Sequence, residues 1–160
     1  MVYNIFISYA TGDEEIRNKL IVVLKENNME PLFYDEKDVA GYDFVQYIKN
    51  LIESSQTLIA ILTPIGTKSQ WVNQEIGYAE KAGKDIIPLV VRGVDIKGFT
   101  ERRHQIRFHV SEWSDGVSKC VDILKKRIRL PDVEVQTTSE NERIRSKQSH
   151  IEKIDDDYYD

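Results

Sequence analysis

Short apolar runs alternate along the chain with segments whose apolar residues recur at helical spacing, and this alternation restricts the possible folds most strongly. A helical pattern follows each of the first three runs, and another ends the series. This order calls for a parallel sheet with right-handed crossovers. We predict an α/β fold, a flavodoxin-like three-layer sandwich with a five-stranded parallel sheet of order 2-1-3-4-5 and helices on both faces. The five strand-like runs are Tyr3–Ser8, Leu32–Tyr34, Leu58–Leu62, Ile86–Val91 and Ile106–Val110.

Capping residues and apolar spacing place the helices. The first is predicted to start at Asp13, the second to cover about Tyr42–Ser54, the third to follow Ser69 and the last to follow Ser114. Ser69 and Ser114 are suited to cap their helices, because a serine hydroxyl can accept a hydrogen bond from a first-turn N–H. Pro88 lies inside the fourth strand and lacks an N–H, which favours an edge strand or a bulge there.

Length and charge limit the class of protein. The 160 residues suffice for one domain, which we place at residues 1–130, and residues 131–160 form an acidic tail that is either mobile or a short helix. The tail holds nine acidic and four basic residues, and the other charges balance. Because neither part offers a basic face, nucleic acid is not an expected partner. No apolar run has membrane-spanning length and the start lacks signal-peptide features, so we expect a cytoplasmic protein and no membrane association.

Several kinds of active site are disfavoured by the residues themselves. The single cysteine, Cys120, excludes an internal disulfide and a thiolate metal cluster, and the three histidines lack metal-ligand spacing, so no metal is expected. Neither common glycine-rich phosphate loop is present, which argues against a P-loop or a Rossmann cofactor site. A phosphate-accepting receiver domain would need acids where the first and third strands end. Those positions hold Ser8-Tyr9 and Thr63-Pro64.

The third helix carries the main candidate site. Val72, Ile76 and Ala79 fall on one stripe that can lie on the sheet, and Trp71 and Glu75 stack one turn apart on its flank. In sheets of the predicted order, the ligand crevice lies outside the carboxyl ends of the first and third strands. We therefore expect the residues after strand one, Ser8, Tyr9 and Ala10, to converge there with the start of this helix. From spacing alone, the favoured interpretation is that Glu75 is an ordinary surface carboxylate and Trp71 a packing residue.

Five pieces of sequence in this order resemble the Toll/interleukin-receptor (TIR) domain family over roughly Val2 to Leu130. The resemblance implies the predicted fold, and Pro88 is commonplace in the family at its place. The pieces are FISYA, the D-x5-G loop from Asp35 to Gly41 with the following Phe44, IAILTP, SQWVNQE from Ser69 to Glu75, and IIPLVV.

The resemblance implies an activity and a set of site residues. In catalytic members, the glutamate of W-x-x-x-E cleaves NAD, and Trp71 to Glu75 match that motif position for position. Glu75 is then the catalytic residue, and NAD is the substrate rather than a cofactor. Ala10 stands where some catalytic members have arginine. The implied substrate-binding residues are Ser8, Tyr9, Ala10, Asp35, Gly41, Phe44, Ser69 and Trp71, with Asp35–Gly41 as a lid and self-association surface.

The resemblance leaves the product and the biological role open. Such enzymes hydrolyse NAD to ADP-ribose or cyclise it to a cyclic ADP-ribose isomer, releasing nicotinamide in both cases. The sequence looks like the small stand-alone TIR proteins of prokaryotic antiviral defence, whose nucleotide product signals to a separate effector protein. The alternative is a non-catalytic module that acts by TIR–TIR assembly. A third possibility is a nucleotide binder of the same fold without turnover.

Overall fold

A computed structural model describes residues 2–35, 43–101 and 103–129, with only the backbone of residues 99 and 129. Most of the predicted lid and all of the predicted tail lie outside the described residues, so the domain boundary at residue 130 stays a prediction. The chain divides into two compact units, Met1–Val121 and Asp122–Asp160. The whole sheet belongs to the first unit. Among the described residues, none of the helices has the length and apolar character needed to span a membrane.

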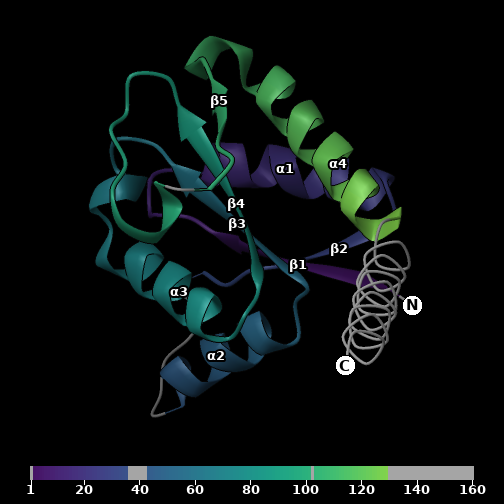
Figure 1. Ribbon diagram of the computed structural model, residues 1–160, viewed down its shortest axis with the longest axis vertical. Coiled ribbons are helices and arrows are strands. Elements are labelled where there is room, and N and C mark those ends of the chain that lie inside the picture. Colours follow the sequence, from purple (N-terminus) through teal and green to yellow (C-terminus); the bar gives the residue numbers. More distant parts are fainter. Residues whose placement is uncertain (1, 36–42, 102, 130–160) are drawn as a thin grey trace, which may run out of the picture. The chain divides into compact units, whose positions relative to one another are not determined.

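Five parallel strands form one sheet in the order β2-β1-β3-β4-β5, which confirms the predicted architecture (Figure 1). The central strands are the longest, and their residues are almost continuously buried because helices cover both faces of the sheet. The bounds are Tyr3–Ser8 for β1, Met29–Leu32 for β2, Thr57–Leu62 for β3, Asp85–Val91 for β4 and Ile106–Phe108 for β5.

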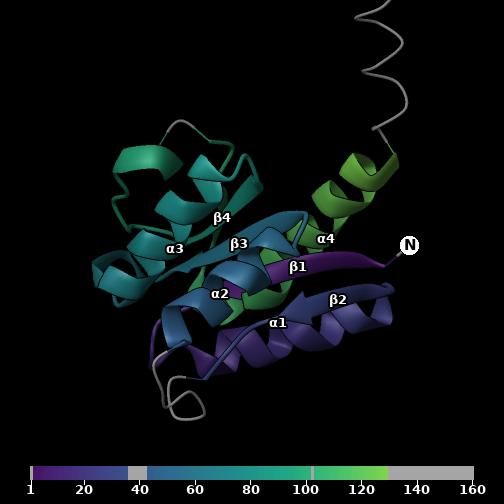
Figure 2. The same cartoon turned by 90° about the horizontal axis from the view of Figure 1, so that it is seen from below.

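Helices pack on both faces of this sheet (Figures 1 and 2). One face carries α2 and α3, and the other carries α1 and the first half of α4. The bounds are Glu14–Glu26 for α1, Phe44–Glu53 for α2, Gln70–Lys81 for α3 and Trp113–Arg129 for α4, with short 3₁₀ helices at Gly66–Lys68 (η1), Gly98–Thr100 (η2) and Val110–Glu112 (η3).

The core on the α2 and α3 side joins alternate strand residues to the predicted helix stripes. Phe6 of β1 and Leu58 of β3 pack there with Ile48 and Ile52 of α2. The stripe of α3 is confirmed, since Val72, Ile76 and Ala79 are all buried in the same cluster. Because side chains alternate along a strand, the intervening residues Ile5, Ile7, Ile59 and Ile61 face the opposite helical layer.

The second strand lies earlier in the chain than the sequence predicts. β2 is Met29–Leu32, so Phe33 and Tyr34, which we assigned to it, lie beyond its carboxyl end. Pro31 is inside the strand and pairs with Ile5. A proline is tolerated there because β2 is an edge strand, with a partner on one side only.

Pro88 lies inside β4, opposite Ala60 of β3. The Arg92 N–H donates to the Phe108 carbonyl on the β5 side at 2.8 Å, and residues an even number apart along a strand point the same way. The missing N–H of Pro88 is therefore on the β5 side, where pairing begins only at Leu89. The sheet loses no hydrogen bond, so a regular strand tolerates this proline.

The two predicted serine caps have different outcomes. Ser69 caps α3 as predicted, because its Oγ accepts a hydrogen bond from the Val72 N–H at 3.3 Å. Ser114 does not cap α4, which begins at Trp113 and leaves Ser114 in its first turn. The 3₁₀ helix η3 runs directly into α4, so the helical backbone starts before the serine.

Gly66 should be intolerant of any side chain. A Cβ there would lie 2.4 Å from the backbone oxygen of Ile61, which cannot move without distorting β3. We expect Gly66→Ala to lower the free energy of unfolding by about 1–3 kcal/mol, as overpacking does elsewhere. Urea unfolding measures this.

Gly77 gives the matched control, because a Cβ there meets nothing within 4 Å and the residue lies inside α3. Gly77→Ala should stabilise the protein by about 0.5–1 kcal/mol. Equal effects of the two variants would contradict the packing described here.

Candidate active site

Glu75 is a buried carboxylate on the flank of α3, with a relative exposure of 3%. The helix α3 places Val72, Ile76 and Ala79 against the sheet. Glu75 is next to Ile76 in the chain and therefore lies at the edge of the same core. The hydroxyl of Tyr34 donates a hydrogen bond to Glu75 Oε1 at 2.6 Å. A charged oxygen removed from water requires such a donor.

A pocket of about 140 Å³ opens beside Glu75 between α2 and α3. Its walls are mainly apolar, so a charge inside it is screened less than in water. Trp71, one turn before Glu75 on α3, lies at this pocket with a relative exposure of 37%. The lining residues are Val45, Ile48, Lys49, Ile52, Trp71, Gln74, Glu75 and Tyr78.

Four aromatic rings form a continuous series from the sheet to Trp71. Phe6 stacks on Tyr34 with ring centroids 6.4 Å apart, and Tyr34 meets Phe44 edge to face at 5.4 Å. Phe44 in turn meets Trp71 edge to face at 5.3 Å. Phe44 therefore lies between Tyr34, which hydrogen-bonds Glu75, and Trp71 at the pocket.

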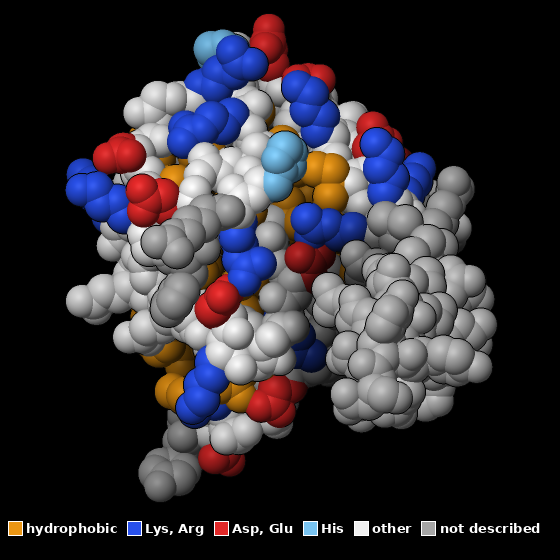
Figure 3. Space-filling view, in the orientation of Figure 1, with side chains coloured by type: hydrophobic (Ala, Val, Ile, Leu, Met, Phe, Trp, Pro, Cys, Tyr) orange, Lys and Arg blue, Asp and Glu red, His pale blue; other side chains and the backbone are white. Residues whose placement is uncertain are grey.

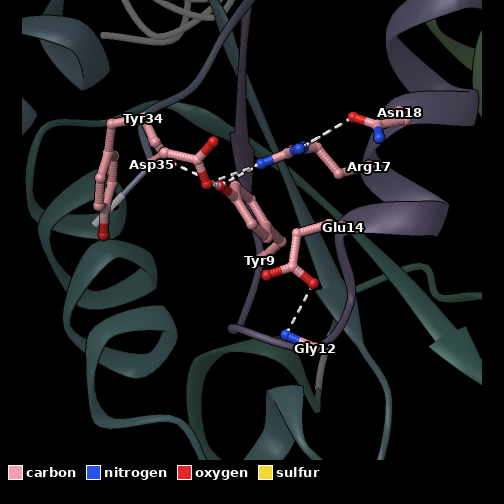
Figure 4. A network of polar contacts seen from close by, with 7 residues as sticks. All are labelled: Tyr9, Gly12, Glu14, Arg17, Asn18, Tyr34 and Asp35. Carbon is pink, nitrogen blue, oxygen red and sulfur yellow. Dashed lines mark hydrogen bonds and ion pairs between the residues drawn. The ribbon is translucent and has the colours of Figure 1, made fainter. Parts of the chain in front are cut away.

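Tyr9 points into a polar cluster with Arg17 and Asp35 (Figure 4). Its hydroxyl donates to the Tyr34 backbone oxygen at 2.7 Å and lies 2.9 Å from Asp35 Oδ1. The Arg17 guanidinium lies 3.1 Å from the same carboxylate oxygen and 4.6 Å from the centre of the Tyr9 ring. Burial, aided by the hydrogen bond to Asp35, raises the pKa of Tyr9 to about 12. The cluster fixes the backbone where Tyr34 and Asp35 leave β2.

A second pocket, of about 490 Å³, lies at the carboxyl ends of β1 and β3, where the sequence predicts the crevice. Ala10 and Ser69 line it, together with Thr11, Pro64, Ile65 and Lys68. Beside it, the buried Asp13 carboxylate accepts a hydrogen bond from the Thr63 hydroxyl at 2.6 Å. Burial raises the pKa of the Asp13 carboxyl, and the Thr63 hydrogen bond acts in the opposite direction.

The structure brings together only some of the predicted site residues. Glu75 and Trp71 line the smaller pocket and Phe44 packs against Trp71, whereas Ala10 and Ser69 line the crevice. Ser8 is fully buried, and its Oγ has no hydrogen-bond partner within the described part of the chain. Gly41 lies outside the described residues.

Sequence reasoning missed Arg17 and Tyr34. Arg17 carried a usable signal: it stands on the helical stripe that continues through Leu20 and Leu24, and an arginine on a buried stripe needs a partner. Tyr34 was counted as one more apolar strand residue. Nothing local shows that its hydroxyl reaches α3, 41 positions further along the chain.

Charges are mixed on the face seen in Figure 3, where Lys and Arg side chains lie among Asp and Glu side chains. No group of three or more His, Cys, Asp or Glu residues suited to holding a metal occurs in the ranges that the structure describes.

The sheet order, with a buried carboxylate beside an aromatic pocket, defines a flavodoxin-like α/β protein with a candidate active site on α3. The model of the TIR domain family matches residues 5–121, and the chain belongs to this family. The resemblance inferred from the sequence pieces is thereby confirmed.

Curated relatives include Toll-like receptor 6 from two mammals. The Bos taurus protein is 32% identical over 78 residues, covering 48% of this chain and 10% of the receptor. The Mus musculus protein is 23% identical over 111 residues, covering 66% of this chain and 14% of the receptor. The chain therefore spans a small part of the receptors' length.

Solved structures share the fold. The TIR domain of the Toll-related receptor TRR-2 from Hydra magnipapillata has a TM-score of 0.64 at 21% identity, covering 80% of this chain and 99% of that domain. The CMP N-glycosidase BcmB from Clostridium botulinum has a TM-score of 0.53 at 20% identity, covering 73% of this chain and 97% of that enzyme.

The pKa of Tyr9 predicts a specific loss of stability in alkali. The folded protein keeps the Tyr9 proton until about pH 12, whereas an unfolded tyrosine loses it near pH 10. The stabilisation is complete below about pH 10 and is lost as the pH rises towards 12. Urea unfolding at about pH 8 and pH 11 should show wild type losing more free energy of unfolding than Tyr9→Phe.

The exposed Tyr47 supplies a control, since Tyr47→Phe should follow wild type. Identical pH dependence of wild type and Tyr9→Phe would refute this prediction.

Proposed function

We propose that this TIR protein cleaves NAD between nicotinamide and ribose, with Glu75 as the catalytic carboxylate. The observation that carries the proposal is the position of Glu75. The residue is 3% exposed, its carboxylate accepts a hydrogen bond at Oε1, and it lies at a mainly apolar pocket beside Trp71. An ordinary surface glutamate would be solvated on the outer face of the helix.

The chemistry of NAD cleavage suits a single carboxylate. Nicotinamide is bound to ribose as a cation and departs as a neutral amide, so its departure requires no general acid. Positive charge develops on the ribose, as in glycoside hydrolysis. A carboxylate held in a weakly screening pocket stabilises that charge. Glu75 is the residue placed for this task.

The size of the pocket suggests which part of the substrate it holds. A volume of about 140 Å³ suits one ring, whereas pockets for whole drug-sized ligands measure roughly 300–1,000 Å³. In this proposal the ribose that reacts is the ring held in the pocket at Glu75, and the exposed Trp71 offers an aromatic face to the cationic nicotinamide outside it. Lys49 lines the same pocket and supplies a positive charge towards the diphosphate.

The product is either ADP-ribose or a cyclic ADP-ribose isomer, depending on whether water or a hydroxyl or ring nitrogen of the substrate attacks the ribose. The proposal includes a cytoplasmic location, self-association through TIR–TIR contacts and a role in antiviral or stress signalling through a separate effector. BcmB, a CMP N-glycosidase by name, supports the proposal in one respect: a protein of this fold is described as acting on an N-glycosidic bond.

The rival function is a non-catalytic module that acts by TIR–TIR assembly. Two observations favour it: the curated relatives are receptors, and α2 exposes the apolar Val45 and Tyr47. Assembly and catalysis are compatible, so only the dependence on Glu75 separates the two functions.

Glu75→Gln should abolish nicotinamide release while leaving the fold intact. The substitution keeps the size of the side chain and removes its charge, so we expect a loss of roughly 100-fold or more in the rate of cleavage. Mass spectrometry of NAD incubated with concentrated protein detects nicotinamide and its nucleotide partner together. A glutamate on the same helix, Glu80, pairs with Arg103 and does not line the pocket, so Glu80→Gln should stay within about threefold of wild type.

Two results would reject the catalytic proposal. One is a wild-type protein that releases no nicotinamide at high concentration, and the other is a Glu75→Gln variant as active as wild type. If self-association and cellular output persist unchanged in Glu75→Gln, the assembly module is the better description.

A further inference from the structure

Tyr34 makes a short hydrogen bond to the candidate catalytic carboxylate. Its hydroxyl donates to Glu75 Oε1 at 2.6 Å, and both groups are buried. This distance falls in the range of about 2.5–2.7 Å that is typical of a hydroxyl donating to an ionised oxygen. Such a bond stabilises the charged form of the carboxylate and restricts its direction.

Tyr34 is itself held from two sides, so it can impose that direction. Its backbone oxygen accepts the hydrogen bond from Tyr9, and its ring packs between Phe6 and Phe44. The ring points away from the cluster formed by Tyr9, Arg17 and Asp35 (Figure 4). A side chain fixed in this way loses little conformational entropy when it binds its partner.

Glu75 has three rotatable bonds, and a hydrogen bond to Oε1 restricts the directions that its carboxylate can take. We propose that Tyr34 is a positioning residue for Glu75, whose hydroxyl fixes the direction of the carboxylate at the pocket between α2 and α3. Its effect on catalysis rests on the proposed function, whereas its effect on the Glu75 side chain does not. Tyr34 thereby couples the end of β2 to the reactive group on α3.

Tyr34→Phe tests the proposal, because it removes one hydroxyl and keeps the ring contacts with Phe6 and Phe44. In protein labelled with ¹³C at glutamate carboxyls, the Glu75 resonance is identified by its absence from Glu75→Gln. We expect this resonance to move in Tyr34→Phe. In NAD cleavage we expect kcat to fall roughly 10- to 100-fold, the effect of losing a hydrogen bond to a charged group, with KM within about twofold.

Tyr3→Phe is the matched control. Tyr3 and Thr57 share a hydroxyl hydrogen bond of 2.7 Å at the amino ends of β1 and β3, whereas Tyr34 follows the carboxyl end of the parallel strand β2. Tyr3→Phe should change neither the Glu75 resonance nor kcat, although it also removes one tyrosine hydroxyl.

The outcomes separate this proposal from the proposed function. A Glu75 resonance that is unchanged in Tyr34→Phe overturns the positioning role, and so does an unchanged kcat in an active enzyme. If wild type releases no nicotinamide, the proposed function fails. The carboxyl resonance alone then decides whether Tyr34 fixes Glu75. Equal losses of kcat in Tyr34→Phe and Tyr3→Phe would show a general loss of structure and would also overturn the proposal.

Discussion

A carboxylate buried at the edge of an apolar core is stable only where polar groups replace the water it has lost. This requirement organises the candidate site, since Glu75 lies on the flank of a helix whose other inward residues are apolar. Its hydrogen bond from Tyr34 ties α3 to the segment that leaves β2. The same segment is held from the other side by Tyr9 and Arg17, so α1, β1, β2 and α3 all contribute to the position of one side chain.

The parallel sheet makes this convergence possible. Because all strands run the same way, the segments that leave β1, β2 and β3 emerge at one edge, although they are far apart in the chain. Two of the pockets in the described part of the molecule differ in character. The crevice at the switch point is larger and is lined by loop residues and Lys68, whereas the pocket between α2 and α3 is smaller, mainly apolar and contains the carboxylate.

The sequence allowed the architecture and the stripe of α3 to be predicted, because both follow from repeating patterns of apolar residues. The family resemblance was also correct. The bounds of β2 and the start of α4 were wrong, since local propensity does not reveal which backbone groups pair with β1 or where η3 continues into a helix. For the site, spacing placed Trp71 and Glu75 side by side. It could not predict that Tyr9 turns towards Arg17, or that Tyr34 meets Glu75, because these contacts depend on tertiary structure.

The two edge strands of the sheet have a consequence for how copies of this protein can associate. One margin of the sheet is β2, which is four residues long and contains Pro31, and the other is β5, which is three residues long. Short margins and a missing N–H give an incoming strand few backbone groups to pair with. Extension of the sheet from one molecule into the next is therefore disfavoured. Any association of copies is then expected to use helices and loops rather than strand pairing.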